Sequence, residues 1–215
     1  MTTTLLQDEI HATIAAHGLP IVSIQPGTLV WRVQETVHAN PLFYNPDSDS
    51  RYGDPHRAIG VCYVAGSDLV AVAETLQHGK AGTGSPVLIK ELEARSLHQL
   101  ETTRVLRVVD AGMLARNAGR RLKDIVESKG QGSTGYTWTQ ALSGVVMRHG
   151  LEVDGMLYPS QVYPLTGSFK GCNLALFDGR GLQLEAVGKQ GLRELELSSG
   201  ETVGEFLNRL RIAVE

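Results

Sequence analysis

The sequence predicts one α+β domain, with helices flanking a mixed β-sheet, over residues 1–215. A chain of 215 residues with 42% hydrophobic residues can bury one sizeable core, which fits one domain better than two. Strand-like alternation occurs in both halves of the chain, and only a few segments have helical spacing between them. No internal repeat occurs at a fixed period. Together these patterns favour an α+β fold around one mixed sheet.

Composition excludes several classes of partner. The formal net charge of -3 gives no positive field that would attract nucleic acid or an anionic membrane surface. The sequence has neither a basic, apolar leader at its start nor an apolar stretch long enough to span a bilayer, so we expect a cytoplasmic protein. Cys62 and Cys172 each lie in an apolar run, which is typical of buried reduced thiols.

In the first half of the chain, apolar spacing predicts two helices and two strands. Residues 1–20 form an amphipathic helix that ends at Gly18 and Pro20. Residues 28–33 alternate as a strand, which puts Arg32 on the face opposite Trp31. Residues 40–59, rich in Pro, Asp and Asn, form a long loop. A strand at 60–65 then leads to Ser67, a suitable N-cap for a helix with an apolar stripe at 69, 72, 73 and 76.

The second half gives weaker signals for its boundaries. Residues 87–92 and 104–109 are predicted strands, and 110–136 an insertion made of a helix and a polar loop. Thr139 is the predicted cap of a helix that stops at Gly150. Strands follow at 155–158 and 172–177, then a hairpin of residues 182–187 and 192–197. A last helix, over residues 203–214, has Thr202 as its cap.

Three familiar catalytic patterns are absent from the sequence. The Gly-rich segment 79–85 lacks the Gly-Lys-Ser/Thr ending that opens a helix in a phosphate-binding loop, because Pro86 follows it. The seven histidines show neither an H-E-x-x-H pair nor a zinc-type spacing, so we predict no metal. No G-x-S-x-G segment supports a serine hydrolase.

Four polar residues in or beside core-forming segments are candidates for a site, although each signal is weak alone. Arg32 lies in a strand, where it needs an anionic partner or forms a salt bridge at the strand edge. Arg51 lies in the long loop, Tyr63 alternates with core residues, and Glu74 lies beside the apolar stripe of its helix. By itself Arg51 is a solvated loop residue, Tyr63 a core tyrosine and Glu74 a surface carboxylate.

Six short segments follow one another along the chain in a fairly specific order. They are Val30-Trp31-Arg32, Arg51-Tyr52-Gly53-Asp54-Pro55, residues 60–65 (GVCYVA), residues 71–76 (AVAETL), residues 154–160 (DGMLYPS) and residues 171–177 (GCNLALF). This succession resembles the RES domain, a family named for an arginine, a glutamate and a serine. Ser160 is the matching serine, and the core of the resemblance covers about residues 28–180. Ser50 and Gly53 depart from the Gly and Asn that many members have around the second arginine.

The resemblance implies a split sheet similar to that of ADP-ribosyltransferases, and an enzyme that consumes NAD as its substrate. Family members are typically toxins of bacterial toxin–antitoxin pairs, neutralised by a helix-turn-helix antitoxin protein. By this resemblance Glu74, Arg32 and Ser160 are catalytic, while Arg32, Arg51, Tyr63 and Ser160 bind NAD. The acceptor can be water, phosphate or a protein side chain, so hydrolysis, phosphorolysis and protein ADP-ribosylation stay open. A non-catalytic nucleotide-binding module, and a homo-oligomer, also stay open.

Overall fold

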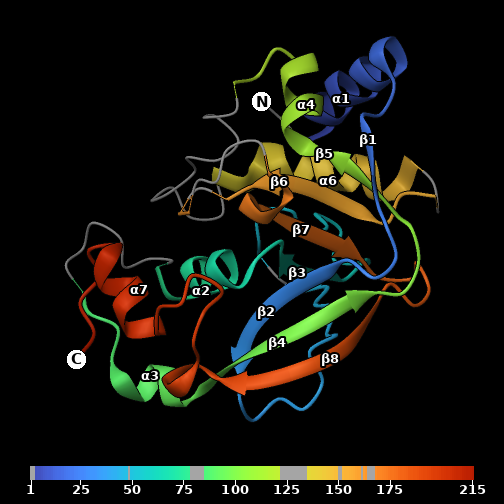
Figure 1. The fold of residues 1–215 in the computed structure, drawn as a ribbon. Helices are drawn as coiled ribbons and strands as arrows, with labels where there is room; N and C mark the ends of the chain where they lie inside the picture. The colour runs from blue at the N-terminus through green and yellow to red at the C-terminus, as the bar shows by residue number, and fades with distance from the viewer. Residues whose placement is uncertain are drawn as a thin grey trace.

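The computed structural model describes residues 3–47, 49–77, 85–121, 135–149, 152–160, 162–163 and 168–215, which form a mixed sheet with helices on its outer faces (Figure 1). The strand order is β1-β5-β6-β7-β3-β2-β4-β8, and every neighbouring pair is antiparallel except β5 and β6. The predicted α+β class with a mixed sheet is therefore confirmed. The strands are β1 (Ile21–Ile24), β2 (Leu29–Glu35), β3 (Val61–Ala65), β4 (Arg95–Thr102), β5 (Leu106–Asp110), β6 (Gly155–Pro159), β7 (Cys172–Phe177) and β8 (Leu184–Gly191).

The sheet is almost split between β2 and β3. These two strands share the single register pair of Trp31 with Ala65. In contrast, β2 pairs with β4 along its whole length, and β3 does the same with β7. From the pair of Trp31 with Ala65, the two strands therefore diverge toward Val61 of β3. Side chains from both strands can line the space between them.

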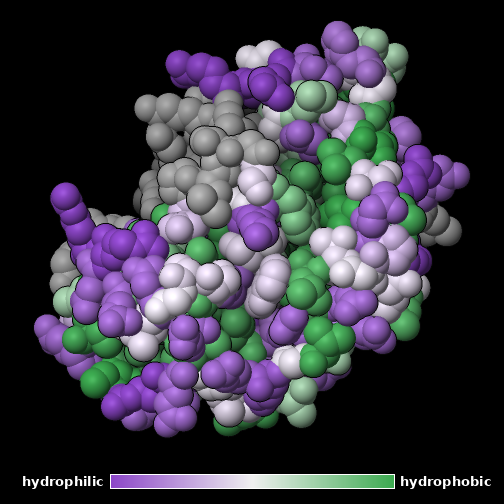
Figure 2. Space-filling view, viewed as in Figure 1, coloured by the Kyte–Doolittle hydropathy of each residue, from purple (hydrophilic) through white to green (hydrophobic). Residues whose placement is uncertain are grey.

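Helices pack on both halves of the sheet. They are α1 (Thr3–His17), α2 (Asp68–Gln77), α3 (Ile89–Glu93), α4 (Ala111–Asn117), α6 (Thr137–His149) and α7 (Val203–Arg209), with 3-10 turns at Phe169–Gly171 and Leu192–Glu194. One core joins α1, α4 and α6 to strands β3, β5, β6 and β7, and a second joins α2, α3 and α7 to strands β2 and β4. A third core fills the concave inner face of the curled sheet. On the face seen in Figure 2, hydrophilic residues surround smaller hydrophobic areas.

Strand alternation distributes side chains between these cores. In β3, Cys62 and Val64 face the inner core, while Val61 and Tyr63 face the α6 side. In β2, Val30 faces the inner core and Trp31 packs with α2. Because successive side chains of a strand point to opposite faces, Arg32 shares the inner side with Val30.

Several local signals in the sequence are confirmed by the structure. The N-terminal helix and the loop after β2 lie where they were expected. The Ser67 hydroxyl accepts a hydrogen bond from the backbone N–H of Val70 at 3.2 Å, so it caps α2. Thr202 caps α7 through the N–H of Glu205, and the Glu205 carboxylate accepts from the backbone N–H of Thr202, which completes a capping box.

Other boundaries in the second half were wrong. The predicted strand 87–92 contains helix α3, because Glu91 accepts a hydrogen bond from the N–H of Leu88 at 3.1 Å and starts a helical turn. Val87, just before Leu88, forms only an isolated bridge with Val214. The predicted strand 104–109 begins at Leu106, and the sequence analysis missed β4 just before it.

The predicted hairpin is one strand. Residues 184–191 form β8 along the edge of the sheet, and an irregularity where β8 pairs with Gln99 and Leu100 breaks the alternation on which the prediction depended. Residues 192–194 turn as a 3-10 helix, and Leu195 and Leu197 pack on α7 without forming a strand. Helix α6 begins at Thr137, so Thr139 lies inside it, and α7 ends at Arg209.

Part of the predicted insertion lies outside the described residues. Helix α4 covers residues 111–117 and is capped by the Asp110 carboxylate, which accepts from the N–H of Met113, but residues 122–134 are not described. The Gly-rich segment 79–84 also lies outside the described residues.

Both cysteines are free; Cys62 is fully buried and Cys172 is half-buried. None of the helices in the described residues is both long and apolar enough to span a membrane.

Candidate functional site

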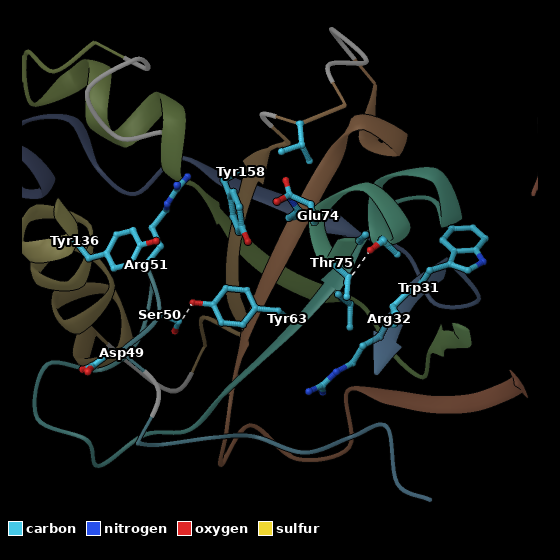
Figure 3. Close-up of a pocket in the computed structure, with 16 residues that line it drawn as sticks. Trp31, Arg32, Asp49, Ser50, Arg51, Tyr63, Glu74, Thr75, Tyr136 and Tyr158 are labelled. Carbon is cyan, nitrogen blue, oxygen red and sulfur yellow. Dashed lines mark hydrogen bonds between the residues drawn. The ribbon is translucent and has the colours of Figure 1, made fainter. Parts of the chain in front are cut away.

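A cavity of about 640 Å³ opens where β2 and β3 diverge (Figure 3). This volume lies within the range of small-molecule sites. Strands β2 and β3, helix α2, and the loop before β3 provide most of its lining. Its polar lining includes Arg32, Asp49, Ser50, Arg51, Tyr63, Glu74 and Asn173, while Trp31, Val33 and Val162 line an apolar part.

Glu74 is the carboxylate of α2 that faces this cavity. Ala71, Glu74 and Thr75 all line it, because positions i, i+3 and i+4 share one face of a helix. The opposite stripe of α2 is buried against the sheet, which fixes the direction of the Glu74 side chain. A half-buried carboxylate on a firmly packed helix is well suited to act on a bound ligand.

Two hydrogen bonds hold one oxygen of this carboxylate. The Ser160 hydroxyl and the Asn173 side-chain amide each donate to Glu74 Oε1 at 2.8 Å. Within the described part of the chain, no hydrogen bond reaches Oε2. The arrangement fixes the plane of the carboxylate and leaves its second oxygen available to a ligand.

Ser160 lies behind Glu74 and contributes no lining to the cavity. It follows β6, it is buried, and its backbone N–H donates to the carbonyl of Gly171 at 2.8 Å. Its hydroxyl also accepts from the N–H of Tyr163 at 3.2 Å, so its single proton is directed at Glu74. The expected role of orienting the sugar therefore changes: this geometry favours orientation of the glutamate.

Tyr63 forms the wall beside Glu74 and ties β3 to the loop. Its hydroxyl donates to Ser50 Oγ at 2.8 Å and accepts from the backbone N–H of Tyr52 at 3.0 Å. Burial raises the pKa of Tyr63 to about 12, so the phenol stays neutral at physiological pH. Tyr52 itself is buried against Tyr158, with ring centroids 4.6 Å apart. Tyr63, Tyr136 and Tyr158 form an aromatic wall along the cavity (Figure 3).

Arg51 provides positive charge at the end of the cavity away from Trp31 (Figure 3). Its guanidinium lies over the ring of Tyr136, 5.7 Å from the centroid. The close-up view shows Arg51 and Glu74 on either side of Tyr158. Arg51 and Glu74 thus line one cavity, with aromatic rings between them.

Helix α6 clamps the loop that carries Arg51. Gln140 donates to the carbonyl of Ser50 at 3.0 Å, and Ser143 donates to the carbonyl of Gly53 at 3.0 Å. Such contacts hold the loop backbone on both sides of Arg51, so the site is built on fixed structure. Sequence patterns gave no sign of this clamp, because residues 90 positions apart form it.

Arg32 lines the same cavity, but its guanidinium is bonded to the loop that follows β2. Its Nη1 donates to the carbonyls of Pro41 and Phe43 at 2.7 and 3.2 Å, and it lies 2.9 Å from Cys62 Sγ. Figure 3 shows its side chain directed away from Glu74. The physical reason is strand alternation: α2 packs on the Trp31 face of β2, and Arg32 points to the other face. Arg32 and Arg51 therefore line one cavity, with Nη1 of Arg32 bonded to the loop, and their expected joint clamp on one ligand group stays a prediction.

Sequence reasoning missed Asn173, Tyr158 and Tyr136. Asn173 had a visible signal, since it is the one polar residue in the strand segment CNLALF. Tyr158 lies in a quoted motif without a role, and Tyr136 lies next to undescribed residues. In the part of the chain that the structure describes, no three His, Cys, Asp or Glu side chains gather as metal ligands.

Fold and site together define an α+β protein with a glutamate-centred ligand cavity at the split of its sheet. A model of the RES domain matches residues 29–198, most of the sequence, so the chain belongs to the RES-domain family. A chain of the crystal structure of the M. tuberculosis MbcT–MbcA toxin–antitoxin complex has a similar fold. It is 19% identical, 96% of each chain is covered, and the TM-score is 0.60. A comparison with curated proteins gives no significant match.

Proposed function

We propose that this protein cleaves the bond between nicotinamide and ribose in NAD, with Glu74 as its catalytic carboxylate. The observation that supports this most directly is the fixed Glu74 side chain, bonded through Oε1 and facing a cavity that also contains Arg51. Membership of the RES-domain family agrees with it, because an enzyme of this family is expected to act on NAD.

The chemistry needs only one carboxylate. The nicotinamide of NAD is already a cationic leaving group, so its departure requires no general acid, unlike ordinary glycoside cleavage with two carboxylates. Positive charge develops on the ribose as the bond breaks. Glu74 Oε2 stabilises that charge, directly or through a ribose hydroxyl, and this preorganised interaction is strongest in the transition state.

The remaining residues bind and orient the dinucleotide. Arg51 donates charge-assisted hydrogen bonds to the pyrophosphate, and Tyr63 and Tyr158 pack on the nicotinamide or its ribose. Ser160 holds Glu74 in place. Arg32 lines the cavity too, and in this proposal it fixes the loop around Pro41 and Phe43.

The first experiment compares the wild-type protein with Glu74→Gln in an assay of nicotinamide release from NAD. The amide preserves size but removes the charge, so we expect binding to persist and kcat to fall at least a hundredfold. Glu93→Gln is the matched control, because Glu93 is an exposed carboxylate on α3 that pairs with Arg193. An unchanged rate in Glu74→Gln rules out the assignment.

The acceptor determines which enzyme class the protein joins. Water gives free ADP-ribose, phosphate gives ADP-ribose 1″-phosphate, and a protein side chain gives a labelled protein. Incubation with NAD labelled in its adenylate part, with and without phosphate, separates these products. Label found mainly on protein favours the ADP-ribosyltransferase alternative.

We further propose that the protein is the toxin of a toxin–antitoxin pair and that a helix-turn-helix antitoxin is its partner. Support comes from the fold shared with a chain of the MbcT–MbcA toxin–antitoxin complex. Expression of the chain in a bacterial host should then deplete NAD and stop growth, whereas Glu74→Gln should not. Co-expression of a small helix-turn-helix protein from the neighbouring reading frame should restore growth.

A further inference from the structure

Asn173 is a polar residue at a position where the fold otherwise has apolar side chains. It lies on β7, between Tyr158 of β6 and Ala65 of β3, in the middle of the sheet. Ala175 and Phe177 project from the same face of β7 and are fully buried in the α6 core. Asn173 is only 5% exposed, so its amide needs hydrogen-bond partners to offset the loss of water.

The orientation of the Asn173 amide follows from its neighbour. Its Nδ2 lies 2.8 Å from Glu74 Oε1. The opposite orientation would bring the carbonyl oxygen of the amide against a carboxylate oxygen, and two acceptors repel at that distance. Asn173 is therefore a donor to the glutamate.

Ser160, directly after β6, and Asn173, on β7, converge on the same oxygen. A single donor leaves a carboxylate free to rotate about the hydrogen bond, whereas two donors from fixed backbone positions define its plane. From these contacts we infer that Asn173 is a positioning residue for Glu74, holding Oε1 so that Oε2 faces the reacting ribose. This inference rests on the proposed function, but its structural part does not need substrate.

Kinetics separate positioning from substrate binding. Asn173→Leu keeps the approximate size and removes the donor; we expect kcat to fall roughly ten- to one-hundredfold, the usual effect of one hydrogen bond to a charged group, while KM changes less than threefold. Asn208→Leu, on the exposed side of α7, is the matched control and should behave as wild type.

The combined variant Ser160→Ala/Asn173→Leu adds a second kinetic test. Because both donors act on one oxygen, their effects on kcat should not be additive. Strict additivity, or a rise in KM with unchanged kcat, would contradict the positioning role. Thermal unfolding of every variant shows whether lost activity reflects lost fold.

A measurement without substrate keeps this inference distinct from the proposed function. In NMR spectra, the side-chain amide protons of Asn173 should exchange slowly with solvent, and Glu74→Ala should accelerate that exchange at least tenfold. Equally fast exchange in wild type and Glu74→Ala would show that Asn173 does not donate to Glu74. If wild type releases no nicotinamide but the amide is protected by Glu74, the proposed function fails while the role of Asn173 in holding the glutamate stands.

Discussion

The guanidinium of Arg148 donates two hydrogen bonds to the carboxylate of Asp54, at 2.9 Å to Oδ1 and 2.8 Å to Oδ2. Asp54 also accepts from the backbone N–H groups of His56, Ala58 and Ile59, and its side chain is fully buried. Through this contact helix α6 fixes the loop between β2 and β3 at Asp54. Three residues before Asp54 in the same loop is Arg51, which lines the cavity.

Asp54→Asn should therefore lower both stability and substrate affinity. The substitution leaves Arg148 without its ionic partner in a partly buried place, and we expect the free energy of unfolding to fall by about 3 kcal/mol. KM for NAD should rise because the loop backbone that carries Arg51 is no longer held in place. Chemical denaturation and steady-state kinetics measure the two effects. Glu152→Gln, at the exposed pair with Arg107, should change stability by less than about 0.5 kcal/mol.

The pKa of Asp54 also predicts how the free energy of unfolding depends on pH in acid. Burial by itself would raise the pKa of Asp54, but the hydrogen bonds from Arg148 and the backbone amides lower it to about 2. An unfolded aspartate has a pKa of about 3.9, so the stabilisation is complete above about pH 4 and is lost as the pH falls toward 2. The stability difference between wild type and Asp54→Asn should shrink over that range. A difference that stays constant down to pH 2.5 would show that the pair is not the cause.

Arg32→Met tests the revised role of the first arginine. Removal of the guanidinium takes hydrogen bonds from the carbonyls of Pro41 and Phe43, so we expect a loss of about 1–2 kcal/mol in unfolding free energy. Although Arg32 lines the cavity, KM for NAD should change less than threefold, because Nη1 is bonded to these loop carbonyls. A large rise in KM with unchanged stability would show instead that Arg32 binds substrate.

Arg51→Met should have the opposite pattern. If Arg51 donates to the pyrophosphate, its loss removes charge-assisted hydrogen bonds and should raise KM about tenfold or more, with a smaller effect on kcat. Arg116→Met, an exposed arginine on α4, provides the control. Equal KM values in wild type and Arg51→Met would contradict this role, and the test is independent of the Glu74 assay because it concerns binding.

Local patterns in the sequence predicted the elements whose signals are short in range. The cap at Ser67, the box formed by Thr202 with Glu205, and strand 172–177 each depend on neighbouring residues, and each is found in the structure. The order of short motifs in the sequence likewise indicated the RES-domain family. Predictions failed where alternation was interrupted, as in β8, or where one capping contact converted the predicted strand 87–92 into α3.

Tertiary structure alone decided which of the motif residues meet. The sequence showed that Arg32 and Trp31 lie on opposite faces of a strand, but only the packing of α2 on the Trp31 face directs Arg32 away from Glu74. Pairing of β3 with β7 brings Asn173 to the glutamate from 99 residues away. Residue patterns determine local conformation because neighbours in the chain always interact, whereas contacts between distant segments depend on how the whole sheet closes.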